Sequence, residues 1–231
     1  MSNHTPRRIN RLADLVAASS YLEIGVESGI SFREVRVEYR TGVDPLFLFD
    51  TGLEVNERTR FVRCTSDEFF DIEPLRSQFD IIFIDGLHTF EQVLRDLMNA
   101  MSRAHDHSAF LIDDVWPNDI YSAIPDRTMA MEMRWATGNK DESWHGDVFK
   151  IVHFIHDFLP CLNYRTVTGS GNPQLLTWFS NKSPRQPRLG SLEAISRLSY
   201  FQFLAAPDIM RACDEEEALQ LCATEIGANL K

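Results

Sequence analysis

The chain has 231 residues, of which 44% are hydrophobic, and its formal net charge is −11. This length and apolar content fit one large domain with a substantial core. The negative charge argues against a general nucleic-acid binder, which needs a basic face. No apolar run reaches the roughly 20 residues of a membrane span, and no signal peptide is recognisable. The four cysteines lie far apart without a C-x-x-C pair, which indicates reduced thiols in a cytoplasmic protein.

Apolar runs and helical patterns alternate through the first half of the chain. An N-terminal helix is expected to begin at a Thr5-Pro6 cap. Apolar segments predict strands near residues 21–24, 40–44, 61–64, 79–84 and 109–112. The intervening helices are expected to begin near Ser28, at Ser66 or Asp67, and at Phe90.

The second half of the chain has a different pattern. A helix over residues 148–159 follows Asp147 as its expected cap and ends at Pro160. Residues 164–181 predict two strands joined by a Gly/Asn/Pro turn, which makes a hairpin at the sheet edge. A last helical region opens with the acidic run 214–217, which the helix dipole favours at a helix start.

Strands that alternate with helices, several of them apolar throughout, indicate a parallel sheet covered by helices on both faces. We therefore predict an α/β fold of the doubly wound, Rossmann-like type, preceded by one helix. Residues 1–181 are expected to form this domain, and residues 182–231 a helical appendage packed on it.

A strand, a glycine turn and a helix start follow one another in "LEIGVESGIS", residues 22–31. Such a turn presents backbone N–H groups to a ligand at Gly25, and Gly29 lets the helix pack near the strand. Asp44 ends the next strand, where its carboxylate can accept both hydroxyl hydrogens of a ribose. The pair predicts an adenosine-containing ligand, although similar turns without a ligand are common. Glu27 stands where a dinucleotide motif needs its second glycine, and no P-loop follows any strand.

Acidic residues directly follow two apolar strands, in "FDIIFIDGLH" and in "AFLIDDVWP". The first delivers Asp85, followed by His88, and the second delivers the pair Asp113 and Asp114. Because the carboxyl ends of parallel strands share one edge of a sheet, these side chains predict one site there. Three carboxylates without a cation would repel one another, which favours a bound metal.

Five motifs, in this order and spacing, resemble the class I S-adenosylmethionine-dependent methyltransferases: "YLEIGVESGISF", "TGVDP", "TSDEFF", "FDIIFIDGLHTFEQVLRD" and "FLIDDVWP". The resemblance is to the small-molecule O-methyltransferase-like branch. It covers residues 21–117 closely and extends loosely to the hairpin. It implies a seven-stranded sheet of order 3-2-1-4-5-7-6 with strand 7 antiparallel, which fits the hairpin predicted from the residues.

The resemblance also implies a role for each motif in holding the cofactor. Glu23 and Gly25 would lie along the methionine part of S-adenosylmethionine, and Asp44 would bind its ribose. Residues 66 and 67 would flank the adenine, unless they only cap the following helix. The cofactor-binding residues implied are Glu23, Gly25, Gly29, Asp44, Ser66, Asp67 and Asp85.

In metal-dependent relatives, the acids after the fourth and fifth strands bind one divalent cation, and Asp85, Asp113 and Asp114 match them. Carboxylate oxygens suit Mg²⁺, which would hold the acceptor hydroxyl near the methyl group. In catechol-type relatives a lysine three residues after the first acid acts as general base, and here His88 holds that position as the expected catalytic base. Alternatively, Asp113 caps the next turn and His88 only bonds a carbonyl of its loop.

The implied activity is transfer of a methyl group from S-adenosylmethionine to a hydroxyl of a small molecule, with Mg²⁺ as an optional second cofactor. Neither a nucleic acid nor a membrane is expected as a partner, and a homodimer is left open. Two other functions stay open. One is a non-catalytic protein that binds S-adenosylmethionine, and the other is a Rossmann-type oxidoreductase, which Glu27 disfavours. The sequence does not identify the acceptor.

Other histidines and tryptophans carry weaker signals. His153 and His156 lie off the apolar face of their predicted helix and are expected in solvent, with a metal shared with Asp157 as the alternative. His105 and His107 precede the fifth strand and are expected on the surface. The polar segment after that strand predicts an aromatic wall for the acceptor, made by Trp135, Trp144 and His145, unless Trp144 only packs against the helix start.

Overall fold

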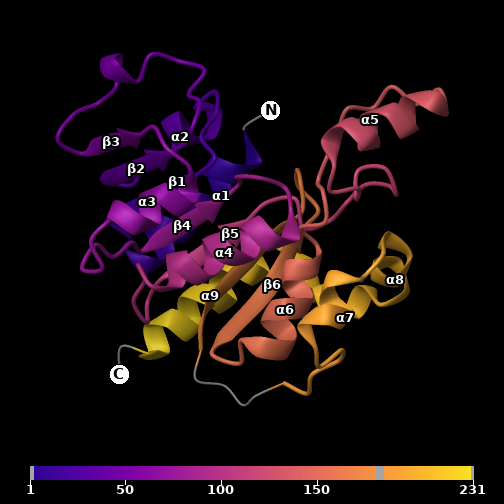
Figure 1. The fold of residues 1–231 in the computed structure, drawn as a ribbon. Helices are drawn as coiled ribbons and strands as arrows, with labels where there is room; N and C mark the ends of the chain where they lie inside the picture. The colour runs from indigo at the N-terminus through magenta and orange to yellow at the C-terminus, as the bar shows by residue number, and fades with distance from the viewer. Residues whose placement is uncertain (1–2, 181–184, 230–231) are drawn as a thin grey trace.

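A mixed β-sheet with strand order β3-β2-β1-β4-β5-β7-β6-β8 forms the centre of the computed structural model, which describes residues 3–180 and 185–229 (Figure 1). Strands β1 to β5 run parallel, and β7 is antiparallel to both β5 and β6. The predicted α/β fold and the predicted order of the first seven strands are therefore confirmed. The strands are β1 (Ser20–Ile24), β2 (Tyr39–Val43), β3 (Thr59–Val62), β4 (Ile81–Ile84), β5 (Ala109–Ile112), β6 (Leu162–Thr168), β7 (Gln174–Phe179) and β8 (Ala212–Asp214).

Helices cover both faces of this sheet, and β4 shows why. Ile82 and Ile84 belong to one apolar cluster with residues of α3, α4 and α6, whereas Ile81 and Phe83 belong to a second with residues of α1, α2 and α9. Successive side chains of a strand alternate between faces, so a strand that is apolar at every position needs cover on both sides. The helices of the described residues are α1 (His4–Val16), α2 (Ile30–Glu34), α3 (Ser66–Ile72), α4 (Phe90–Met101), α5 (Arg127–Ala136), α6 (Lys150–Phe158), α7 (Leu192–Ser196), α8 (Tyr200–Ala205) and α9 (Glu215–Asn229), with 3₁₀ helices at Thr51–Leu53 and Pro207–Met210.

Strand β8 is absent from the sequence-based prediction. It pairs in parallel with β6, and Thr166 lies opposite Ala212. The β6–β7 hairpin therefore does not form the edge of the sheet, contrary to the prediction. Three residues are too few to show the alternation that identifies a strand in a sequence.

Helix α3 begins at Ser66, as predicted, but three predicted helix caps are wrong. Helix α3 is capped by Thr65 in a capping box with Glu68, so neither residue 66 nor residue 67 is its cap. Helix α6 begins after Phe149 without a side-chain cap, so Asp147 has another role. Thr5 lies inside α1 and accepts a hydrogen bond from Gln174. The acidic first turn of α9 is as predicted.

The C-terminal segment belongs to the same core as the sheet. Helix α9 packs beside α1, and its Leu219, Cys222 and Ile226 join the second apolar cluster. The predicted boundary between residues 181 and 182 lies outside the described residues, so the division into two parts stays a prediction. Among the described residues, no helix combines the length and apolar character that a bilayer crossing requires.

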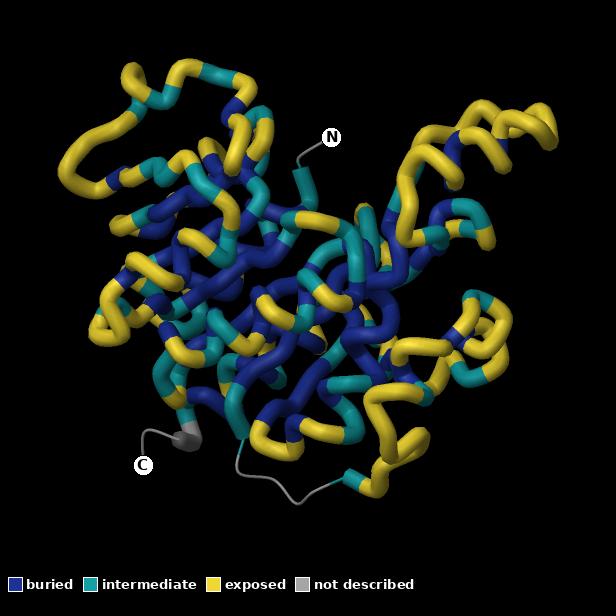
Figure 2. The backbone as a smooth tube through the Cα atoms, in the orientation of Figure 1, coloured by how far each residue is buried: buried dark blue, intermediate teal, exposed yellow. Residues whose placement is uncertain are grey.

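Residues 118–147, which connect β5 to α6, form an arm that carries α5 and projects from the sheet (Figure 1). Figure 2 shows the arm largely exposed, with few buried positions. One of these is Arg134, which is fully buried and donates to the carbonyls of Asp141 and Ser143 and to the carboxylate of Asp119. This arginine thus ties α5 to the two ends of the arm.

Candidate functional site

A cavity of about 1000 Å³ opens at the carboxyl ends of β1, β2, β4 and β5. This is the edge of a doubly wound sheet where ligands bind. Of the predicted site residues, these line the cavity: Glu23, Gly25, Asp44, Ser66, Asp67, Asp85, His88, Asp113 and Asp114. Gly29 is not among the lining residues. Its φ of +75° and the Phe49 ring beside it make its role one of packing.

Gly25 allows β1 and β4 to approach each other at the cavity wall. Its φ is +88°, and a Cβ atom at this position would lie 1.8 Å from the carbonyl oxygen of Asp85. The sequence analysis assigned this glycine to close approach of a ligand. The structure shows that the backbone at the end of β4 already requires it.

Asp44 holds two loops of the cavity wall together. One carboxylate oxygen accepts from the backbone N–H of Glu27 at 2.8 Å, and the other accepts from Leu46 at 2.7 Å. Each oxygen keeps a second lone pair, so a ribose diol at this position would find acceptors. The residue is 8% exposed.

Glu23 is a buried carboxyl on β1. Burial raises its pKa to about 8, the nearby charges of Asp85 and Asp44 act in the same direction, and a hydrogen bond from Tyr21 at 2.6 Å opposes them. Burial likewise raises the pKa of Asp85. Burial therefore disfavours the charged form of both carboxyl groups.

Gln92 of α4 lines the same cavity and was missed by the sequence analysis. Its amide donates to Ser66 at 3.1 Å and to Asp96 at 3.0 Å. It therefore joins the start of α3, where the adenine is predicted, to α4. The signal in the sequence is weak, because a glutamine in the first turns of a helix is ordinarily a solvated residue.

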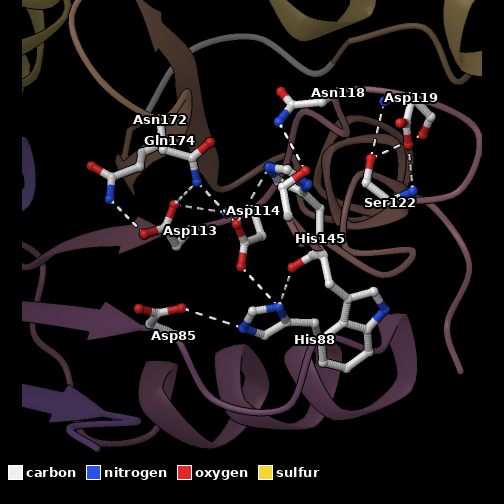
Figure 3. Close-up of polar contacts among 12 residues, drawn as sticks. Asp85, His88, Asp113, Asp114, Asn118, Asp119, Ser122, His145, Asn172 and Gln174 are labelled. Carbon is white, nitrogen blue, oxygen red and sulfur yellow. Dashed lines mark hydrogen bonds and ion pairs between the residues drawn. The ribbon is translucent and has the colours of Figure 1, made fainter. Parts of the chain in front are cut away.

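His88 lies between two carboxylates (Figure 3). Its Nδ1 is 3.0 Å from Asp114 and 2.9 Å from the backbone carbonyl of Trp144, and its Nε2 is 3.6 Å from Asp85. A carbonyl only accepts, so the bond to Trp144 places a proton on Nδ1. Burial lowers the pKa of His88, but Asp114 and Asp85 outweigh burial and raise it to about 11. His88 is therefore an imidazolium at neutral pH.

Asp113 is turned toward the β6–β7 hairpin. Its carboxylate accepts from Asn172 at 2.6 Å and from Gln174 at 3.0 Å (Figure 3). Burial, followed by the charges of Asp85 and Asp114, raises its pKa well above the usual range. Asn172 also donates to Asp114 at 2.9 Å, so the hairpin fixes both acids.

The sequence analysis did not predict that the hairpin bonds to Asp113 and Asp114, because the sequence around Asn172 is typical of a simple turn. Arg8 anchors the turn from α1, with hydrogen bonds to the carbonyls of Ser170 and Asn172 and to the Gln174 side chain. Its guanidinium also pairs with Glu215 at 3.0 Å. The first residues of α1 and of α9 thus support the acids at the end of β5.

The group able to hold a cation differs from the predicted one. Ligand atoms of Asp85, His88 and Asp114 all lie within 4.8 Å of one another. Asp113, which the sequence analysis placed with Asp85 and Asp114, is held by amides instead. The set gathered by the structure is two carboxylates and one imidazole.

The arm contributes the opposite wall of the cavity. Trp144 and His145 line it, as predicted, and so do Asn118 and Arg127. Trp135 is 53% exposed and is not among the lining residues. The Trp144 ring stacks on His88 with a centroid distance of 4.8 Å, so one of its faces is already covered.

Among the described residues, the other histidines form no second set of metal ligands. His153 is buried, so its predicted exposure is wrong. His156 bonds to Tyr164 at 2.9 Å, while Asp157 accepts three backbone N–H groups of residues 188–190. His105 pairs with Asp80 at 3.0 Å.

Comparison with known proteins agrees with this geometry. Residues 22–115 match a family model described as a methyltransferase domain. Similar solved structures include the O-methyltransferase TomG of Streptomyces achromogenes in complex with S-adenosylmethionine, with 14% identity, a TM-score of 0.54, and coverage of 78% of this chain and 81% of that chain. Cofactor-bound Rv0187 from MTB has 16% identity, the same coverages and a TM-score of 0.54. The S-adenosylhomocysteine-bound methyltransferase PaMTH1 of Podospora anserina has 13% identity, coverages of 78% and 80%, and a TM-score of 0.51.

No curated protein shows significant sequence similarity to the chain. The fold is nonetheless shared with these solved methyltransferase structures, and residues 22–115 match the methyltransferase-domain model. The resemblance inferred from the five motifs is thereby confirmed.

Proposed function

We propose that the protein transfers a methyl group from S-adenosylmethionine to a hydroxyl group of a small molecule. The observation that carries this proposal is a single cavity with two distinct walls. One wall holds the residues predicted for an adenosine-containing ligand, and the other holds a cluster of acids around His88. The methyltransferase-domain match and the cofactor complexes of TomG and PaMTH1 support it.

The cavity suits a cationic cofactor. S-adenosylmethionine carries an ammonium and a sulfonium group, and it supplies an electrophilic methyl group when bound. Either positive charge would offset the cost of ionising Glu23 and Asp85, whose pKa values burial raises. We assign the ribose to Asp44 and the methionine part to Glu23 and Gly25. The adenine is assigned to residues 66 and 67, with Gln92 beside them.

The acceptor hydroxyl has to lose its proton as the methyl group arrives. His88 alone is a poor acceptor, because Asp85 and Asp114 hold it in the protonated form. We propose that Asp85, His88 and Asp114 act as one proton-sharing unit, which takes up the hydroxyl proton as a whole. His145, 3.7 Å from Asp114, lies beside this unit.

The same three residues are the ones that would hold a divalent metal. Their donor atoms are close enough to share an ion, but one of them is an imidazole nitrogen, which Mg²⁺ takes less readily than oxygen. Metal binding would also require neutral His88. We propose that the His88 imidazolium supplies the positive charge of the cluster in place of a metal ion.

The test is production of S-adenosylhomocysteine with a library of hydroxyl acceptors, in EDTA-treated protein and after addition of Mg²⁺ or Mn²⁺. We expect turnover that a chelator does not reduce. His88→Ala is expected to lower kcat by roughly 10²–10⁴-fold and to leave the Kd of S-adenosylmethionine nearly unchanged. Loss of activity with EDTA and its recovery with a metal would establish the metal-assisted form. Binding without any turnover would support a non-catalytic protein, and tight NAD binding an oxidoreductase.

A further inference from the structure

Four consecutive residues at the C-terminal end of the arm, 144–147 with the sequence "WHGD", lie against the loop that carries His88. That loop runs from Gly86 to the first residue of α4, Phe90. The two segments are more than 50 residues apart in the chain, yet three residues of the first make a distinct contact with the second. We call residues 144–147 the seam.

Trp144 fixes the imidazole itself. Its carbonyl accepts from Nδ1 of His88 at 2.9 Å, and its indole ring stacks on the imidazole at an interplanar angle of 17°. The indole Nε1 donates to the carbonyl of Ile124 at 2.7 Å, which fixes the ring. The imidazole therefore has one orientation, with Nε2 toward Asp85.

Gly146 lets the seam approach the His88 backbone. Its φ is +57°, and a Cβ at this position would lie 1.6 Å from the carbonyl oxygen of His88. Any side chain would separate the two segments, because the neighbour is backbone and cannot move aside alone.

Asp147 caps α4 from a distance. The N-cap residue of α4, Thr89, makes no side-chain cap bond. Asp147 accepts the N–H of Phe90 at 2.7 Å instead, and its second oxygen pairs with Lys150 at 2.7 Å. Lys150 in turn donates to the carbonyl of Ser196. A carboxylate at a helix N-terminus satisfies an unpaired N–H and interacts favourably with the helix dipole.

We infer that the seam is a positioning device, in which Trp144, Gly146 and Asp147 hold His88 in register with Asp85 and Asp114. This inference rests on the proposed function, because it assigns the seam to alignment of the same proton-sharing unit. The seam also continues the wall that Asn118, Arg127 and Ser143 give to the acceptor side of the cavity. An acceptor that contacts the arm would therefore also affect the position of His88, because the arm and the seam are continuous.

The experiment compares Asp147→Ala with Asp147→Asn. Alanine removes the cap of α4, whereas asparagine keeps an oxygen that accepts from Phe90. We expect Asp147→Ala to lower kcat by up to roughly 10²-fold, as for an approximately 1 Å misplacement of a reacting group, with the KM of S-adenosylmethionine unchanged. Asp147→Asn is expected to recover most of kcat. Asp50→Ala, which removes the carboxylate that caps the 3₁₀ helix Thr51–Leu53, is the matched control and should leave kcat unchanged, because neither Asp50 nor that helix lines the cavity.

A second readout does not require turnover. The Nδ1–H proton of His88 should give an exchange-protected signal in ¹⁵N-histidine-labelled wild-type protein and in Asp50→Ala, assigned by its loss in His88→Gln. It should weaken or vanish in Asp147→Ala. If Asp147→Ala does not fold, Trp144→Leu removes the stacked ring and is expected to weaken the same signal.

The results separate the two proposals. An unchanged His88 signal and an unchanged kcat in folded Asp147→Ala, or in folded Trp144→Leu, would overturn the inference that the seam positions His88. Absence of the signal from wild-type protein would also overturn it. A wild-type protein that shows the signal but transfers no methyl group to any acceptor would contradict the proposed function and leave the seam intact.

Discussion

His153 is 3% exposed on α6, and within the described residues neither of its ring nitrogens has a hydrogen-bond partner. The apolar stripe of the helix made this side chain appear to face solvent. The apolar stripe did not predict the burial of His153, because α6 also contacts Tyr164 and residues of the C-terminal segment. A buried imidazole without partners costs stability, since it gives up hydrogen bonds with water.

Burial lowers the pKa of His153 from 6.5 to about 4. Between these values the unfolded chain binds a proton that the folded protein does not. The free energy of unfolding therefore decreases as the pH falls from 6.5 toward 4, by about 2–3 kcal/mol from this residue. We expect His153→Leu to stabilise the protein at pH 7, by about 1–3 kcal/mol, and to reduce the loss at pH 5.

Urea unfolding at pH 7 and pH 5 measures both effects. His153→Gln is the matched control, because glutamine does not titrate but keeps a polar group buried. It should reduce the pH dependence without the gain in stability at pH 7. An unfolding free energy of His153→Leu that depends on pH as steeply as in the wild type would contradict this account.

The residues of the site fall into two groups by how well the sequence predicts them. Asp44 and Asp85 end apolar strands, so their place at the sheet edge follows from local pattern. Asn172 and Trp144 act on acids and on an imidazole more than 55 residues away. Nothing local indicates such contacts, because they depend on which strands become neighbours.

At the scale of elements, the arm of residues 118–147 has a polar centre of its own. Arg134 makes three hydrogen bonds between 2.7 and 2.9 Å to the two ends of the arm. A guanidinium reaches several acceptors at once, and a lysine ammonium at the end of a flexible chain does not reproduce this geometry. Arg134→Lys should therefore loosen the arm while the sheet remains intact.

We expect this variant to show faster amide exchange and faster proteolysis confined to residues 118–147. The KM of the acceptor should rise, because Asn118, Arg127 and Trp144 line the cavity from the arm, and the Kd of S-adenosylmethionine should not change. Arg197→Lys, which alters an exposed pair with Glu193, is the control. Faster amide exchange throughout the protein, and not only in residues 118–147, would indicate global destabilisation instead.

Elements with long periodic patterns were predictable, and short ones were not. Residues 90–101 were predicted as a helix and form α4, whose apolar positions recur over three turns. Strand β8 has only three residues, and its place beside β6 depends on tertiary contacts such as those of α9 with β6 and β8. The cap of α4 by Asp147 was equally hidden, because the acid lies next to a different helix in the sequence.

At the scale of the whole molecule, Glu215 connects three regions. It pairs with Arg7 at 2.8 Å and Arg8 at 3.0 Å, and it accepts from Ser170 at 2.9 Å. Burial raises the pKa of Glu215, but the hydrogen bonds from Arg7, Arg8 and Ser170 outweigh burial and lower it to about 2. The stabilisation is therefore complete above pH 4.5 and is lost as the pH falls toward 2.

Glu215→Gln is expected to lower the free energy of unfolding at pH 7 by about 1–3 kcal/mol, because it leaves the buried Arg8 without its ion pair and solvent partly screens the lost interaction. The difference from the wild type should shrink at pH 3. Glu216→Gln, which affects an exposed pair with Arg11 and a hydrogen bond from Gln220, should change stability much less at either pH. Equal losses in the two variants would show that Glu215 has no special role.

The dependence of the acids at β5 on the start of α9 has a consequence for synthesis of the protein. Asp113 leaves the ribosome about 100 residues before Glu215, which is roughly 5–20 s at ordinary rates of elongation. During that interval the nascent chain can pair β1 to β5, but the β6–β7 hairpin still lacks Glu215, the ion-pair partner of Arg8, which anchors its turn. The unfinished protein thus carries its acidic cluster in an unsupported form, and the site is completed only after residue 215 has been added and α9 has docked.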